Sequence, residues 1–307
     1  MPIYKYVTAE RIDILRHARI RFTQPSAFND PFECFPYFEA IASQKYINDF
    51  LRSGFCNENE LEKMLAESWA RETRKYPGIN LPFDNVKGPL KTAMHNAQPF
   101  INDIFKSLMT MQSPLAREIT LGAVKNAMNN EIGILCLSEK KDDLLMWAHY
   151  AMNHTGFVIE FDEAHLFFNQ KADTNEIRGK LKQVVYSLDR PRVIFQTIEE
   201  NREKWIEDIF WVKSRHWEYE REWRIICSLR DCQRRINMAP HEIYLFPIPK
   251  SSIKGVILGC RISDEDKKAI VGLIGGDSDY SHIRLSQASM DEREYRLKFE
   301  ALLSYND

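Results

Sequence analysis

The stretch HWEYEREWRIICSL, residues 216–229, places three carboxylates, two arginines and two tryptophans in and directly before an apolar run. Its alternation predicts a strand over residues 217–229, since successive side chains of a strand point to opposite faces. One face then carries Trp217, Tyr219, Trp223, Ile225, Cys227 and Leu229. The other carries Glu218, Glu220, Glu222 and Arg224. Glu220 and Glu222 would lie about 7 Å apart at Cα, so both carboxylates would reach one small ligand.

The same pattern is also typical of a purely structural strand. In that interpretation one face is buried, the other is solvated, and Arg224 pairs with a neighbouring glutamate. Other parts of the sequence are needed to distinguish a ligand-binding face from a solvated face.

The composition is that of an ordinary globular protein. In 307 residues, 42 lysines and arginines stand against 44 aspartates and glutamates, so the chain lacks the strong positive charge of non-specific nucleic-acid binders. Its six cysteines form no CxxC pair, which predicts reduced thiols. The first residues lack the apolar segment of a signal peptide, and no run reaches the roughly 20 apolar residues of a membrane span. We therefore expect a cytoplasmic protein with no membrane partner.

Short apolar runs predict strands at both ends of the chain. PIYKYV (2–7) and RIRFT (19–23) flank a helix that begins near Thr8. Further strand-like runs are IGILCLS (132–138), GFVIEFD (156–162), KQVVYSL (182–188), EWRIICSL (222–229), EIYLFPI (242–248), KGVILGC (254–260), HIRLSQA (282–288) and YRLKFEAL (295–302). Helices are expected at about 142–152, 194–213 and 264–273. Because the N-terminal pair is too small to be stable alone, strands from both ends should share one mixed sheet in an α+β fold.

Residues from about 39 to 131 have a different pattern. NELEKMLAESWARETRKY (59–76) and PLAREITLGAVKNAMNN (114–130) are typical of helices, and YPGINLPFDNVKGP (76–89) is typical of a loop. We predict a single α+β domain over residues 1–307 with a helical insertion at about 39–131.

Common nucleotide and metal motifs are absent from the sequence. It contains no GxxxxGK[ST], GxGxxG, GxSxG or HExxH, and no Cys/His array with zinc spacing. We therefore predict neither triphosphate hydrolysis nor a metal site.

Two other stretches combine turns with polar side chains. QPSAFNDPFE (24–33) predicts a turn before Pro31, and Asn29, Asp30 and Glu33 would offer oxygens at a cleft mouth or simply build that turn. In residues 136–162, Ser138 ends a strand just before a helix, where a side chain either binds a phosphate or ribose or caps the helix.

Four tryptophans fall between residues 205 and 223 among basic side chains. Trp205, Trp211, Trp217 and Trp223 alternate with lysines and arginines, a composition suited to base stacking and phosphate contact. Core packing explains most of these tryptophans equally well.

Several of these motifs together resemble a known family. They are YKY (4–6), FNDPFE (28–33), MWAHYA (146–151), HTGFVIEFD (154–162), Lys213 and WEYEREWR (217–224). In this order they resemble the bacterial and phage family known as domain of unknown function 2971, which by itself implies no chemistry.

The order of elements is also similar to that of ADP-ribosyltransferases. In that superfamily a first strand grips NAD through His or Arg, a second carries Ser or Tyr, and a later strand carries a catalytic Glu. The resemblance implies that Glu222, with Glu220, is the catalytic pair, and that Ser138 or Tyr150 is the middle element. Lys5 or Tyr6 stands where His or Arg is expected, and Ser138 lacks the flanking Ser-Thr-Ser pattern.

The resemblance assigns a role to each of these side chains. Loss of nicotinamide from NAD passes through an oxocarbenium-like state, and Glu222 would stabilise that charge by binding the ribose. Glu220 would orient or deprotonate the acceptor. Arg224 or a nearby lysine would meet the pyrophosphate, with Lys5, Tyr6, Ser138 and Tyr150 completing the NAD site.

We therefore expect an NAD-consuming ADP-ribosyltransferase-like enzyme, acting on a protein or nucleic-acid acceptor, as a bacterial defence or toxin effector. NAD hydrolysis without an acceptor is the alternative chemistry. A nucleic-acid-binding or processing module and a non-catalytic scaffold held by a structural ion network are the alternatives from other classes.

Overall fold

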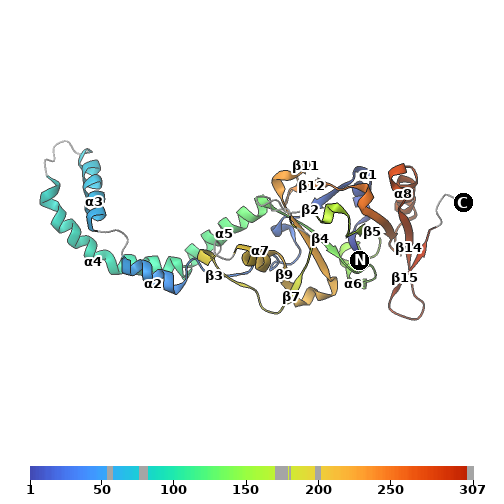
Figure 1. Ribbon diagram of the computed structural model, residues 1–307, viewed down its shortest axis with the longest axis horizontal. Helices are drawn as coiled ribbons and strands as arrows, with labels where there is room; N and C mark the ends of the chain where they lie inside the picture. Colours follow the sequence, from blue (N-terminus) through green and yellow to red (C-terminus); the bar gives the residue numbers. More distant parts are fainter. Residues whose placement is uncertain (54–57, 76–81, 170–178, 180, 198–201, 303–307) are drawn as a thin grey trace. The chain divides into compact units, whose positions relative to one another are not determined.

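The computed structural model describes residues 1–53, 58–75, 82–169, 179, 181–197 and 202–302 (Figure 1). The chain divides into two compact units. One, here called the sheet unit, comprises 1–36, 124–191 and 206–307; the other, the helical unit, comprises 37–123 and 192–205. The prediction of a single domain stays a prediction.

A mixed eight-stranded sheet forms the centre of the sheet unit, in the order β15-β14-β13-β5-β1-β4-β10-β6. Its strands are β1 (Pro2–Val7), β4 (Ile132–Ser138), β5 (Phe157–Asp162), β6 (Lys182–Gln183), β10 (Glu222–Ser228), β13 (Ile253–Leu258), β14 (Arg284–Met290) and β15 (Leu297–Ala301). Among the described residues, β13 and β14 pair in parallel, and every other neighbouring pair of strands in this sheet is antiparallel. The α+β fold with strands from both chain ends in one mixed sheet is therefore confirmed.

The sheet is covered on both faces, which explains why β4 and β5 are almost wholly apolar. On one face, Ile3 and Val7 of β1 join the core that includes Ile270 of α8 (Asp264–Gly275) and Leu15 of α1 (Asp13–His17). On the other face, the tyrosines of β1 pack against Trp147 of α6 (Leu144–Tyr150). Helix α6 thus lies over the side of the sheet to which Tyr4 and Tyr6 point.

The register of the sheet aligns residues that are far apart in the sequence. Tyr4 of β1 is opposite Ser138 of β4, and Ser138 is opposite Glu222 of β10. Because directly opposite residues of antiparallel strands point to the same face, these three side chains share one face. Within the described residues, Tyr4 and Ser138 are the only directly paired positions of β1 and β4.

Smaller sheets complete the sheet unit. β2 (Arg19–Phe22), β12 (Ile243–Pro247) and β11 (Arg234–Ile236) form a three-stranded antiparallel sheet, and β7 (Val185–Ser187) pairs in parallel with β9 (Val212–Ser214). A bridge from Thr23 to Ile134 ties the end of β2 to β4.

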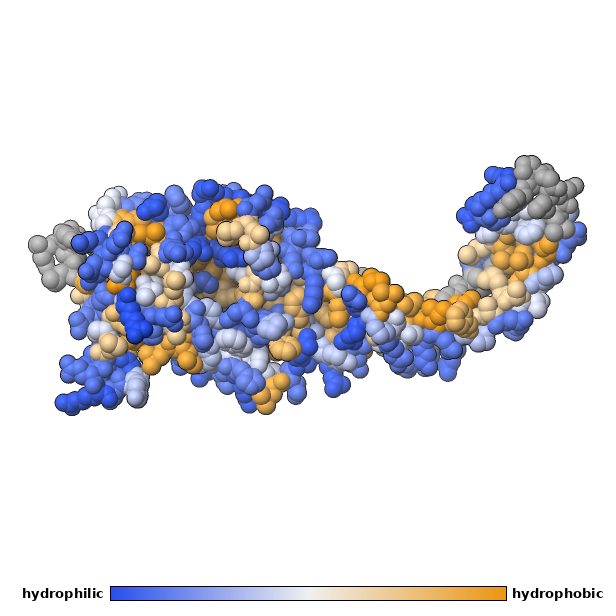
Figure 2. Space-filling model, turned by 180° about the vertical axis from the view of Figure 1, so that it is seen from behind, coloured by the Kyte–Doolittle hydropathy of each residue, from blue (hydrophilic) through white to orange (hydrophobic). Residues whose placement is uncertain are grey.

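The helical unit contains α2 (Gln44–Ser53), α3 (Glu58–Thr73) and α4 (Phe83–Met109), part of α5 (Pro114–Glu131) and of α7 (Arg202–Phe210), and the parallel pair β3 (Tyr37–Ala40) and β8 (Arg192–Ile194). Unlike the sheet strands, α4 has no buried residue, and Phe100, Ile104 and Leu108 are exposed along it. Figure 2 shows this apolar surface on the helices.

Three sequence predictions need correction. The strand predicted from residue 217 begins only at Glu222, because residues 215–220 form a 3-10 helix and Arg221 has left-handed backbone torsions. Of the helix predicted at 194–213, the described residues contain a 3-10 turn at Phe195–Thr197 and α7, residues 198–201 lie outside the described residues, and residues 212–214 form β9 instead. The loop predicted at 76–89 lies partly outside the described residues, and from Phe83 onward it is helical despite Pro89 within α4.

Among the described helices, none combines the length and the apolar character needed to cross a membrane.

Candidate functional site

A cavity of about 380 Å³ lies within the sheet unit, where β1 and β4 separate beyond their single paired position. Its walls come from β1, β4, α6, the turn around residues 27–33 and the segment that leads into β10. The predicted site residues that line it are Lys5, Tyr6, Ser138, Tyr150, Glu220 and Glu222. The YKY strand, the end of the IGILCLS strand and the two glutamates therefore meet at one cavity.

Lys213 lies at the centre of a buried ion network on one wall. Its Nζ lies 2.6 Å from Glu220 Oε2 and 2.8 Å from Glu222 Oε2, and 3.5 Å from Glu33 Oε1. Three carboxylates from two distant parts of the chain thus contact one ammonium group. Although Glu220 and Glu222 are not neighbours on one strand face, both carboxylates still reach a common point.

Arg224 is the second cation of this network and has no exposed surface. Its Nε donates to Glu222 Oε1 at 2.7 Å and its Nη2 to Glu222 Oε2 at 3.0 Å. Nη2 also contacts Glu33, and Nη1 donates to the carbonyl of Phe210 at 2.7 Å. The guanidinium fork is therefore engaged by the protein itself, which leaves Arg224 unable to meet a ligand pyrophosphate without breaking these contacts.

The three carboxylates of the network have different pKa shifts. Burial raises the pKa of Glu220 and Glu33 by more than Lys213 and Arg224 lower it. Burial also acts on Glu222, but there the charges of Arg224 and Lys213 outweigh it and hold the pKa well below its usual range. With two cations against three carboxylates, Glu222 is therefore expected to be the last of the three to take up a proton as pH falls.

Tyr150 connects helix α6 to this network. Its hydroxyl donates to Glu220 Oε1 at 2.5 Å and accepts from Asn29 Nδ2 at 3.4 Å. Burial and the charge of Glu220 raise the pKa of Tyr150 far above its usual value, so the phenol remains a donor. Helix α6 can hold it there because Asp143 caps the helix, accepting from the N–H groups of Leu145 and Met146.

Ser138 fixes the segment that carries Glu220. Its buried hydroxyl donates to the carbonyl of Glu220 at 2.6 Å and accepts from the N–H of Lys140 at 3.0 Å. On the other side of the turn, the N–H of Glu222 donates to the hydroxyl of Tyr186 at 2.8 Å. Ser138 therefore holds the turn between the two glutamates, whatever else it contacts in the cavity.

Lys5 and Arg21 also line the cavity, and neither belongs to the ion network. Lys5 Nζ donates to the carbonyl of Cys136 at 2.8 Å, and its pKa is lowered by burial. Arg21 has a buried Nε with no hydrogen-bond partner among the described residues, and burial lowers its pKa as well. Tyr6, by contrast, donates its hydroxyl to the carbonyl of Lys140 at 2.9 Å.

Sequence reasoning missed Arg21. A signal was available, since the alternation in RIRFT puts Arg21 between two apolar residues, Ile20 and Phe22, which both become core residues. A basic side chain on the opposite face of so short a strand indicates either a solvated edge or a site. The sequence alone does not distinguish a solvated edge from a site, because the cavity forms only when β1, β2 and β4 come together.

Of the other candidate residues, Asn29, Glu33 and His149 line the cavity, and Asp30 does not. Asp30 closes its own turn by accepting from the N–H of Phe32 at 2.9 Å, and Glu33 belongs to the ion network. His149 is exposed at the cavity, 6.5 Å from Trp217 between ring centroids. Trp211 and Lys213 are both buried, so the tryptophan-rich segment is not a continuous exposed platform for bases.

Potential metal ligands also occur in the network. Atoms of Glu33, Cys136 and Glu222 lie within 4.8 Å of one another. Oxygens of both carboxylates already contact Arg224 and Lys213, and burial raises the pKa of the Cys136 thiol well above its usual value. A cluster neutralised by two cations and carrying a protonated thiol is a poor metal ligand set.

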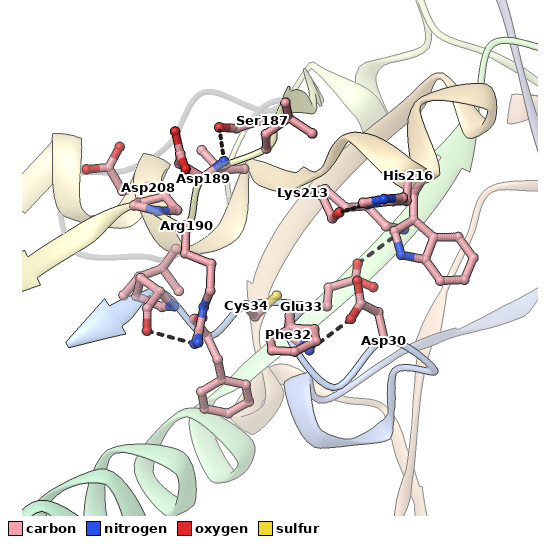
Figure 3. A pocket seen from close by; sticks show the side chains of 18 residues that line it. Asp30, Phe32, Glu33, Cys34, Ser187, Asp189, Arg190, Asp208, Lys213 and His216 are labelled. Carbon is pink, nitrogen blue, oxygen red and sulfur yellow. Dashed lines mark hydrogen bonds and ion pairs between the residues drawn. The ribbon is translucent and has the colours of Figure 1, made fainter.

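A second cavity of about 360 Å³ adjoins the ion network (Figure 3). Figure 3 shows Lys213 and Glu33 in its wall, joined by their ion pair, with His216 and Asp30 nearby. Because Glu33 and Lys213 line both cavities, the buried network is a shared wall.

Comparison with known proteins finds one family. Residues 146–225 match the family described as Protein of unknown function (DUF2971). This segment includes Tyr150, Lys213, Glu220 and Glu222, and it contains three of the motifs that carried the resemblance in the sequence. No curated protein and no solved structure matches the chain.

Proposed function

We propose that the cavity between β1, β4 and α6 is the active site of an ADP-ribosyltransferase-like enzyme that consumes NAD. The observation that carries the proposal is the pair of buried glutamates at one cavity wall, one held ionised and the other with a raised pKa. Carboxylates whose pKa values are pushed apart by their surroundings are suited to different roles in one reaction.

In the proposed reaction, the bond between ribose C1′ and the nicotinamide nitrogen breaks, and its electron pair leaves with neutral nicotinamide. Positive charge then develops on the ribose, and the ionised Glu222 stabilises it. The acceptor atom forms a new bond to C1′ and gives its proton to Glu220. A raised pKa makes Glu220 a stronger proton acceptor than an ordinary glutamate.

Tyr150 and Ser138 are proposed to position Glu220 rather than to react. Tyr150 holds one carboxylate oxygen, Lys213 holds the other, and Ser138 holds the main chain of the same residue. Lys5 remains a proposed contact for NAD, whereas the contacts of Arg224 favour a supporting role beneath Glu222.

A non-catalytic binding protein is the second candidate, and the saturation of Glu222 favours it. Each oxygen of Glu222 already contacts a cation, which is also what a structural ion network requires. In this alternative the cavity binds its ligand without breaking a bond.

The test is nicotinamide release from NAD by the purified full-length chain, with and without candidate protein and nucleic-acid acceptors. We expect release by the wild type and a loss of about 10²–10⁴-fold in Glu220→Gln. Glu131→Gln is the matched control, because Glu131 pairs with Arg230 at the surface. Absence of release under every condition, from protein that melts cooperatively, would leave the binding alternative.

A further inference from the structure

Two basic side chains of the cavity lack the partners that buried cations normally have. The ammonium of Lys5 contacts one main-chain carbonyl, and within the described residues neither Lys5 nor Arg21 forms an ion pair with a carboxylate. For the Arg21 guanidinium the described part of the chain supplies no hydrogen-bond acceptor at all, although its Nε is buried. Both side chains line the same cavity as the two glutamates.

This arrangement is costly for the free protein. Lys5 and Arg21 are partly buried, and no carboxylate among the described residues compensates the hydration that they lose, whereas the buried cations Lys213 and Arg224 are paired with carboxylates. The lowered pKa of both groups has the same origin, and the charge of Arg21 contributes to lowering the pKa of Lys5. The two cations are thus within electrostatic reach of each other.

A ligand with negative charge would remove this cost. An arginine fork with free N–H groups matches the oxygens of a phosphate in a bidentate geometry, and a lysine adds a point charge. Glu222 of the same cavity already contacts Arg224 and Lys213, and among the described residues it forms no ion pair with Lys5 or Arg21.

We propose that Lys5 and Arg21 form a phosphate-binding subsite of the cavity, which takes the phosphate or pyrophosphate group of a small-molecule ligand. The subsite rests on the proposed function only for the identity of that ligand as NAD. Any phosphorylated small molecule whose remaining part fits beside Glu220 and Glu222 satisfies the same geometry.

The test is calorimetric titration of the full-length chain with inorganic pyrophosphate at fixed ionic strength. We expect the wild type to bind and Arg21→Gln and Lys5→Gln each to bind between about tenfold and 100-fold more weakly, as for loss of a hydrogen bond to a charged group. Arg230→Gln is the matched control, because it removes a surface arginine whose partner is Glu131, and it should bind as the wild type does.

The remaining outcomes are also decisive. No binding by the wild type, or equal binding by both cavity variants and the control, overturns the subsite. Binding of a single-stranded oligonucleotide that pyrophosphate does not displace points to a nucleic-acid strand instead and also overturns it. Pyrophosphate binding that both variants weaken, without nicotinamide release by the wild type, refutes only the proposed function, whereas nicotinamide release by the wild type without pyrophosphate binding refutes only the subsite.

Discussion

Two walls of the cavity hold their cations in opposite ways. In the paired wall, Lys213 lines the cavity and, together with the buried Arg224, contacts three carboxylates and a main-chain carbonyl. In the unpaired wall, Lys5 contacts a single carbonyl and Arg21 has no acceptor among the described residues. The first wall is complete without a ligand, and the second is not. The difference indicates which charges maintain the fold and which remain available for binding.

The largest expected effect is loss of stability on breaking the paired wall. Glu222→Gln removes the carboxylate that contacts both Arg224 and Lys213, so part of their buried positive charge is no longer balanced. We expect this to lower the free energy of unfolding by about 3–5 kcal/mol. Urea unfolding of the variant measures it. Glu131→Gln, at an exposed pair, should cost less than about 1 kcal/mol. Equal losses in the two variants would mean that the buried network is no more important than a surface pair.

A smaller effect is expected from the hydroxyl that holds the turn between the glutamates. Ser138→Ala leaves the carbonyl of Glu220 and the N–H of Lys140 without a buried partner, at a cost of about 1–3 kcal/mol. Thermal melting measures this loss. Ser228→Ala serves as the control, because the Ser228 hydroxyl accepts from the N–H of Arg230 in an exposed position rather than a buried one. If Ser138→Ala melts with the control, Ser138 is free to contact a ligand as the sequence pattern suggested.

Removing the phenol that contacts Glu220 should cost still less. Tyr150→Phe deletes one hydrogen bond at a carboxylate that faces the cavity, so we expect a loss of about 1 kcal/mol. The same bond lowers the pKa of Glu220, and its loss should therefore raise that pKa further. The pH dependence of nicotinamide release would then move to higher pH in the variant, and a profile that stays in place contradicts a contact with the proton-accepting group.

The smallest expected effect is a change in the slope of stability against pH. The folded-state pKa of Glu220 lies above the unfolded value of 4.5. Between these two pKa values the folded protein holds more protons than the unfolded chain does. Stability therefore falls as pH rises from 4.5 until the folded pKa is passed. Glu222 has the opposite sign, because its stability contribution is present above pH 4.5 and is lost as pH falls below it.

Glu220→Gln removes the contribution of Glu220 to the pH dependence of stability. The decline in stability above pH 4.5 should become shallower, and part of it should remain because the pKa of Glu33 is also raised. Urea unfolding of the wild type and the variant across this range measures the slope. A steeper decline in the variant would show that Glu220 is ionised more easily in the folded protein than in the unfolded one.

The sequence predicted the strands better than the site they build. Apolar runs such as residues 132–138 coincide with β4, because a strand buried on both faces has no polar position to obscure its ends. The same reasoning failed before Glu222, since the alternation of residues 217–221 fits a strand as well as the 3-10 helix that is present. Only the contact of the turn with Ser138 and Tyr186 selects between them.

Charge pairing depends on tertiary structure even more strongly. Glu33 lies 191 positions from Arg224 in the sequence, yet their side chains are in contact. The prediction that Arg224 pairs with a neighbouring glutamate is confirmed by Glu222, although the pair is buried rather than solvated. The missing partner of Arg21 is a property of the assembled cavity, and no local pattern predicts it.

The most direct test of the difference between the walls is thermal melting of Arg21→Met and Arg224→Met beside the wild type, with and without inorganic pyrophosphate. Removal of the unpaired Arg21 should leave the melting temperature unchanged or higher and abolish most of the rise that pyrophosphate produces in the wild type. Removal of the paired Arg224 should lower the melting temperature strongly while the rise with pyrophosphate persists. An Arg21→Met protein that melts as low as Arg224→Met, or that still responds fully to pyrophosphate, would contradict the account.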